Sequence, residues 1–145
     1  MRRCARVAAV AAAGLILTAG GTSAAFADPS DDPSSAAAEL CTDLSELGSD
    51  SAALRALNPA SATKDQVKEA YKDVQDSWKN VAESTATWDT AKKDAVKKAA
   101  DALVKAYKDL PGDTTGTDAL RQLSPHTAGL ESAVTTARTG LTCPS

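Results

Sequence analysis

The sequence has few of the residues on which catalytic and metal sites depend. It contains one histidine, His126, and three cysteines among 145 residues. A three-histidine or cysteine–histidine metal site is therefore excluded within one chain. No G-x-S-x-G sequence surrounds a serine, and P-loop, dinucleotide-binding, EF-hand and HExxH signatures are absent. The sequence thus predicts no metal and no cofactor, and we expect a protein that is not an enzyme.

Large apolar side chains are also scarce. Beyond residue 27 the chain has 11 Leu and 6 Val but no Ile, Phe or Met, and Ala is the commonest residue, with 21. This composition excludes a transmembrane protein, a multidomain enzyme and a large sandwich or barrel. A share of large aliphatic residues this low is typical of disordered chains, so the arrangement of these residues decides whether a core forms.

The first 27 residues predict a secretory signal peptide. Three arginines lie within the first six residues, an apolar stretch follows at 7–19, and Ala-Phe-Ala at 25–27 fits cleavage between Ala27 and Asp28. A permanent membrane anchor is the alternative, but a span needs roughly 18 apolar residues and this run is shorter. We therefore expect a secreted protein, extracellular or associated with the cell wall, with no membrane span after the signal peptide is removed.

Removal of the signal peptide leaves two of the three cysteines. Cys41 and Cys143 lie near the two ends of the remaining chain. Export places them in an oxidising compartment, where disulfides persist. We expect an intramolecular Cys41–Cys143 disulfide, which stabilises by about 4–5 kcal/mol in the chain-entropy model. Two free buried thiols or an intermolecular bridge are the alternatives.

The rest of the chain predicts a short tail and one helical domain. Residues 28–34 are polar and contain prolines, so we expect them to be disordered. Within 35–145 the apolar residues recur at steps of three and four, which is the helical spacing.

Four helical segments are predicted in this domain. The first covers about 34–57, with a cap at Ser34 or Ser35 and a kink or break at 48–50. The second begins with a capping box, with Thr63 as the N-cap and Gln66 three residues later. The third follows a turn at 84–90, although the absence of Gly and Pro between Pro59 and Pro111 also permits one long rod. The fourth covers about 117–141 and is expected to divide at Ser124-Pro125.

Four segments of similar length joined by short turns predict an all-α fold. The expected architecture is an Ala-rich, antiparallel, up-down-up-down four-helix bundle. This topology returns the end of the fourth helix to the start of the first, so that Cys143 would lie beside Cys41. The helix lengths and the disulfide are independent inferences, and they agree.

Several features resemble small exported proteins of actinobacteria. These are Cys-Thr-Asp-Leu at 41–44 after a signal peptide, a helical middle rich in Ala, Asp, Lys and Val, and Cys-Pro at 143–144. The resemblance implies an exported helical protein. No activity is established for these proteins, so no functional residue is carried over from them.

The charged residues predict solvated helix surfaces and not a catalytic acid pair. We expect ion pairs in which an acid precedes a lysine by three or four residues, each worth about 0.2–0.5 kcal/mol. Residues 28–50 carry seven acids and no base, so we expect charge attraction between the first helix and the Lys-rich ones. The expected pairs are Asp65–Lys68, Glu69–Lys72, Asp76–Lys79, Asp89–Lys92, Asp94–Lys97 and Asp101–Lys105.

Four aromatic residues form a candidate ligand groove between the second and third helices. Tyr71, Trp78, Trp88 and Tyr107 are the bulkiest side chains of the predicted domain. Packing in the core is the favoured interpretation. A groove that takes an apolar ligand or a partner helix is the alternative.

We therefore expect a secreted, non-enzymatic interaction module. Its expected partner is a cell-wall polymer or another exported protein. Nucleic acid is not expected, because the net charge beyond residue 27 is −6. One alternative is a carrier of an apolar small ligand between the second and third helices. Another is a small enzyme that uses His126 or an acid pair.

Overall fold

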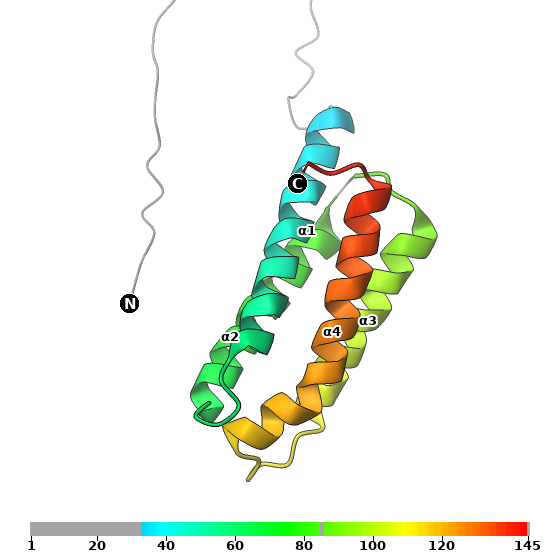
Figure 1. Cartoon of the computed structure of the whole chain (residues 1–145). Coiled ribbons are helices and arrows are strands. Elements are labelled where there is room, and N and C mark those ends of the chain that lie inside the picture. Colours follow the sequence, from blue (N-terminus) through cyan, green and yellow to red (C-terminus); the bar gives the residue numbers. More distant parts are fainter. Residues whose placement is uncertain (1–32, 85, 145) are drawn as a thin grey trace, which may run out of the picture.

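The computed structural model describes residues 33–84 and 86–144. The predicted signal peptide, its cleavage position and residues 28–32 of the predicted tail lie outside the described residues. Within them the chain forms helices and no strand, as predicted (Figure 1). The helices are α1 (Pro33–Ala56), α2 (Lys64–Glu83), α3 (Thr90–Lys108) and α4 (Gly116–Gly140).

Side-chain caps determine where α2, α3 and α4 begin. The Thr63 hydroxyl accepts a hydrogen bond from the Gln66 N–H at 3.2 Å, and the Gln66 side chain accepts one from the Thr63 N–H at 2.9 Å. This confirms the predicted capping box. At the starts of α3 and α4, the Asp89 and Thr115 side chains accept a hydrogen bond from the backbone N–H three residues on, without the reciprocal bond of a capping box. The turn predicted between α2 and α3 is also confirmed, so these helices are not one rod.

The four helices pack around one core. Helix α1 packs against α2 and α4, and α3 packs chiefly against α4. The α1–α2 and α3–α4 connections meet at one end, where Thr117 Oγ1 donates to the Pro59 carbonyl and Lys64 Nζ donates to the Gly112 carbonyl, both at 2.5 Å. The start of α1 and the end of α4 lie together at the other end (Figure 1). This arrangement of the ends is consistent with the predicted up-down-up-down order.

The core is a set of aliphatic, alanine and tyrosine side chains, mostly on one stripe of each helix. These stripes are the ones that the spacing of the sequence predicts. The helical members of the core are Leu40, Leu44, Leu47, Leu54, Val67, Tyr71, Val74, Val81, Val96, Ala100, Leu103, Ala119, Leu120, Leu123, Leu130, Val134 and Ala137.

A disulfide joins Cys41 in α1 to Cys143 just beyond α4, which confirms the predicted pairing. The two Cα atoms are 5.5 Å apart, a separation that a disulfide spans without movement of the backbone. The bond therefore closes the bundle at the end where the described chain begins and finishes.

The break predicted at 48–50 is wrong, because α1 continues through these residues. A Cβ atom at Gly48 would lie 3.5 Å from Val134 Cγ1, so Gly48 faces α4 across a close helix contact. The Ser51 hydroxyl donates to the Leu47 carbonyl at 2.7 Å within the same turn. Tertiary packing thus outweighs the cost of glycine in a helix, which is about 1 kcal/mol.

The division predicted at Ser124-Pro125 is also wrong, because α4 is one helix with Pro125 inside it. Pro125 lacks the N–H that would bond the Arg121 carbonyl. The axis of α4 changes direction near the start of the helix (Figure 1), and the helix continues beyond the proline. Leu123 and Thr127 are buried on either side of the proline, so both parts of α4 remain packed on the same core.

The expected caps of α1 are wrong as well. The helix begins at Pro33, so Ser34 and Ser35 lie inside it. Proline fits the first turn of a helix because the N–H that it lacks would have no helical partner there.

Candidate functional site

A surface hollow of about 510 Å³ lies where the end of α1 meets the bend of α4. Its walls are largely apolar, and its only charged residues are two arginines. It is lined by Leu54, Arg55, Leu57, Pro59, Thr117, Leu120, Arg121, Leu123, Ser124, Pro125, Thr127 and Ala128.

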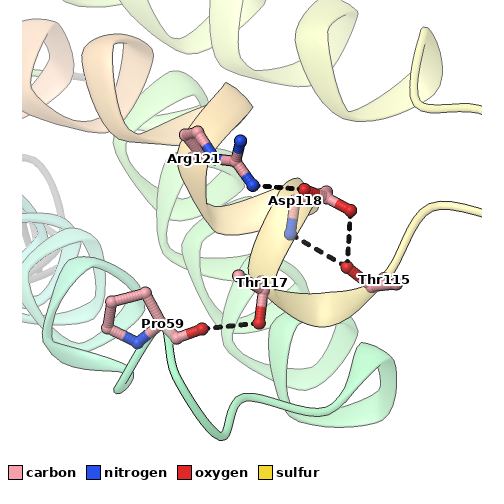
Figure 2. Close-up of polar contacts among 5 residues, drawn as sticks. All are labelled: Pro59, Thr115, Thr117, Asp118 and Arg121. Atoms are coloured by element: carbon pink, nitrogen blue, oxygen red, sulfur yellow. Dashed lines mark hydrogen bonds and ion pairs between the residues drawn. The ribbon is translucent and has the colours of Figure 1, made fainter.

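Two local features shape this hollow. Pro125 bends α4 beside the end of α1, and the hydrogen bond from Thr117 to the Pro59 carbonyl holds the α1–α2 connection against α4 (Figure 2). The Thr127 hydroxyl donates to the Leu123 carbonyl at 3.1 Å. The hydroxyl protons of both threonines are therefore already used within the protein.

The two arginines of the hollow are held in different ways. Arg55 reaches from α1 to Glu131 of α4, with 2.8 Å between Nη1 and Oε2. The Glu131 side chain is only 20% exposed, and its other oxygen, Oε1, is buried without a hydrogen-bond partner. Arg55 therefore neutralises a largely buried carboxylate.

Arg121 pairs with Asp118 one turn earlier in α4 (Figure 2), and both side chains are well exposed, at 72% and 47%. Asp118 also accepts a hydrogen bond from the Thr115 hydroxyl at 2.8 Å, and its backbone N–H donates to the same hydroxyl at 3.1 Å. The Asp118 carboxylate lies in the first turn of α4, where the helix dipole favours negative charge. It therefore keeps favourable interactions when Arg121 moves away.

The four aromatic residues of the candidate groove pack in or against the core, which is the interpretation that the sequence favours. Tyr71 is buried and stacks on Tyr107, with ring centroids 3.7 Å apart and planes at 8°. Burial raises the pKa of Tyr71, and the neighbouring Tyr107 adds to the effect. Trp78 and Trp88 are half-buried against the core, and Trp88 Nε1 is buried without a hydrogen-bond partner. A small hollow of about 140 Å³ includes only Tyr107 of the four in its lining.

His126 is half-buried inside α4; because this helix does not divide at Ser124-Pro125, His126 does not lie at the start of a new helix. Among residues 33–84 and 86–144, no side-chain hydrogen bond or ion pair joins it to an acid or a serine. No group of three His, Cys, Asp or Glu side chains in the described part of the chain is placed to hold a metal ion. None of the four described helices is long and apolar enough to cross a membrane.

A second hollow, of about 490 Å³, lies between α1 and α2 and is acidic. The Ser77 hydroxyl donates to Asp50 across the two helices. The predicted charge attraction between α1 and the Lys-rich helices is therefore wrong, because acids of α1 face acids of α2. The apolar stripes decide which helices are neighbours, and the surface charges follow. The hollow is lined by Ser45, Glu46, Ser49, Asp50, Asp73, Asp76, Ser77 and Asn80.

The ion pairs along α2 and α3 also differ from those predicted. In each observed pair the lysine precedes the acid by four residues, whereas the sequence suggested acids before lysines. Exposed pairs of this kind contribute at most about 1 kcal/mol, so small differences in side-chain position decide which form. The observed pairs are Lys72–Asp76, Lys79–Glu83, Lys97–Asp101 and Lys105–Asp109.

Asp73→Asn is expected to raise the free energy of unfolding by about 0.2–0.5 kcal/mol at neutral pH. Burial raises the pKa of Asp73, and the negative charges of Asp50, Glu69 and Asp76 raise it further. The folded protein therefore binds the Asp73 proton more readily than the unfolded chain does. The charged Asp73 carboxylate lowers the free energy of unfolding by its full amount above the pKa of the folded state. This destabilisation disappears as the pH falls below 3.8, the ordinary pKa of an aspartate.

Urea unfolding of both proteins at neutral and at acidic pH measures this difference. Asp101→Asn is the matched control, because Asp101 pairs with Lys97 and its loss should lower stability slightly at neutral pH. The same sign of change in both variants would contradict the proposed repulsion around Asp73.

No protein-family model, no curated protein and no solved structure matches this chain. The fold and the hollow together define a disulfide-closed helical bundle with an apolar hollow at its surface. The function of the protein is therefore inferred from the geometry of this hollow.

Proposed function

We propose that this chain is an exported, non-enzymatic interaction module that binds its partner in the apolar hollow between α1 and α4. The observation that carries this proposal is the chemistry of the lining. Apolar side chains from two helices and a connection form the walls, as in most ligand sites. The two charged residues are arginines, which stay protonated in proteins and so cannot act as general acids or bases near neutral pH.

Three features support the proposal of export. The Cys41–Cys143 disulfide is of the kind that persists in oxidising compartments. The N-terminal sequence has the features of a signal peptide, and the chain resembles small exported proteins of actinobacteria. We therefore propose an extracellular or cell-wall-associated location, and a partner that is a cell-wall polymer or another exported protein.

The two alternative functions have less support. A carrier with its ligand between α2 and α3 would need space where Tyr71 and Tyr107 stack on each other. An enzyme that uses His126 would need an acid or serine hydrogen-bonded to it, and the described residues provide neither.

Photo-crosslinking tests the proposed binding surface. The photoreactive residue benzoylphenylalanine at Ala128, on the wall of the hollow, is expected to form adducts when the protein is exported by its own host and irradiated. The same residue at Ala53, which is exposed on α1 outside the hollow, is the control. Equal adduct yields at the two positions, or none at either, would contradict binding at the hollow.

A further inference from the structure

We propose that the hollow takes a long-chain carboxylate of the fatty-acid class, with the hydrocarbon chain against the leucines and the carboxylate on Arg121. This inference rests on the proposed binding at the hollow, and it assigns a small amphiphile as the occupant in place of the polymer or protein partner. It draws on three observations: the apolar walls, the unequal attachment of the two arginines, and the small number of free hydroxyl groups in the lining.

The walls suit a hydrocarbon chain. The half-buried Leu57 comes from the α1 side, and the lining also includes the buried core leucines Leu54, Leu120 and Leu123. The volume of about 510 Å³ lies within the range of small-ligand sites. Each methylene that leaves water for such a surface favours binding.

The arginines suit a carboxylate. The described residues contain three arginines, and two of them, Arg55 and Arg121, line this hollow. A planar guanidinium can donate two parallel hydrogen bonds to one carboxylate, which the ammonium group of lysine cannot do. A hollow with arginines at its edge therefore complements an apolar molecule with an anionic end.

Only one of the two arginines is free to exchange its partner. Moving Arg55 would leave the carboxylate of Glu131 without its cation in a largely buried place, which is costly. Arg121 makes an exposed pair that contributes little. Asp118 would keep the Thr115 hydroxyl and the favourable helix N-terminus after Arg121 left it (Figure 2). Arg121 is thus the residue that takes the ligand carboxylate, and Arg55 remains a fixed part of the wall.

The polar groups of the lining favour a hydrocarbon over a peptide. A bound peptide brings backbone N–H and C=O groups that need hydrogen-bond partners. The Thr117 and Thr127 hydroxyls already donate to the Pro59 and Leu123 carbonyls. Ser124 is the remaining hydroxyl of the lining, whereas a hydrocarbon chain needs no such partner.

Calorimetric titration of the disulfide-bonded protein with dodecanoate, below its micelle concentration, tests the proposal. We expect saturable binding at one site. Dodecyltrimethylammonium, which has the same chain and a cationic head, should bind at least about tenfold more weakly, since it cannot accept hydrogen bonds from Arg121. Equal affinities for the two amphiphiles, or no saturable binding of dodecanoate, would overturn the proposal.

Three variants locate the site. Arg121→Gln should weaken dodecanoate binding by about tenfold or more, and it should not weaken the cationic amphiphile, because the substitution removes a like charge. Ala128→Phe should weaken both amphiphiles, because it narrows the hollow. Lys98→Gln removes the same charge from the exposed face of α3 and should leave dodecanoate binding within about twofold of the original. Equal losses in Arg121→Gln and Lys98→Gln would show general charge attraction and contradict the site.

The two proposals can fail separately. Loss of dodecanoate binding with persistent crosslinks at Ala128 would overturn the fatty-acid inference and leave the binding role standing, with a macromolecule in the hollow. Loss of both would overturn the binding role as well. Helical circular dichroism of each variant verifies that any loss of binding occurs in a folded protein.

Discussion

Replacing Cys143 with serine is expected to lower the free energy of unfolding by about 4–5 kcal/mol. The disulfide joins residues that are 102 positions apart, so it constrains nearly the whole of the folded domain. Without it the unfolded chain gains the entropy of an open loop, whereas the helices keep the same contacts. This loss is a large share of the free energy of unfolding of a typical small domain, which is about 5–15 kcal/mol.

Urea unfolding of the oxidised protein and of Cys143→Ser measures this effect. Chemical reduction of the original protein and the double variant Cys41→Ser/Cys143→Ser should both give the same midpoint as the single variant. The double variant also removes the free Cys41 thiol, which excludes intermolecular bridges as a cause. Unchanged midpoints would show that the apolar core alone sustains the fold. Under the proposal of export, the mass of the mature protein should fit a chain that starts at Asp28, two mass units below the reduced form.

Gly116→Ala is expected to lower the free energy of unfolding by about 1–3 kcal/mol. Gly116 is buried at the start of α4, and a Cβ atom there would collide with the Ala62 carbonyl oxygen and lie 2.6 Å from the Thr63 carbonyl carbon. These are backbone atoms next to the capped start of α2, so they cannot move aside as a flexible side chain would. The two connections at this end of the bundle would therefore be pushed apart.

Gly129→Ala is the matched control in the same helix. Gly129 is exposed, and a Cβ atom there would meet nothing within 4 Å. Alanine is the better helix former by about 1 kcal/mol, so this variant should be as stable as the original or more so. Thermal and urea unfolding of both variants give the comparison. Destabilisation by Gly129→Ala as large as that by Gly116→Ala would contradict the close contact at Gly116.

The capped start of α2 and the turn between α2 and α3 could be predicted from the sequence, because they depend on local interactions. The capping box of Thr63 and Gln66 uses neighbours in the sequence, and its hydrogen bonds form wherever the helix packs. Three predictions about the helices were wrong, at 48–50, at Ser124-Pro125 and at the start of α1, and they have two causes. At the first two places, local propensity favours an interruption, and burial of the flanking side chains keeps the helix continuous. The third is local, since Pro33 itself suits a first turn.

The candidate site was much less predictable. The sequence favoured core packing for Tyr71, Trp78, Trp88 and Tyr107, and it offered a groove between them only as the alternative, because bulky aromatic residues often line ligand sites. The structure brings Tyr71 and Tyr107 into a stack and places the apolar hollow at the opposite helix pair, α1 and α4. The one available signal was Pro125, a proline within a helical pattern four residues after Arg121. Its significance depends on what lies opposite the bend.

The sequence by itself determined the all-α class, the apolar stripe of each helix and the pairing of Cys41 with Cys143. These follow from periodicity, from capping residues and from the number of cysteines, none of which requires knowledge of distant contacts. Only the tertiary structure decided that α1 lies between α2 and α4, that acids face acids across α1 and α2, and that Arg55 and Arg121 share one hollow. The physical reason is that burial of the apolar stripes determines which helices pack together. Exposed ion pairs are weaker, so they form only between the side chains that this packing brings close to each other.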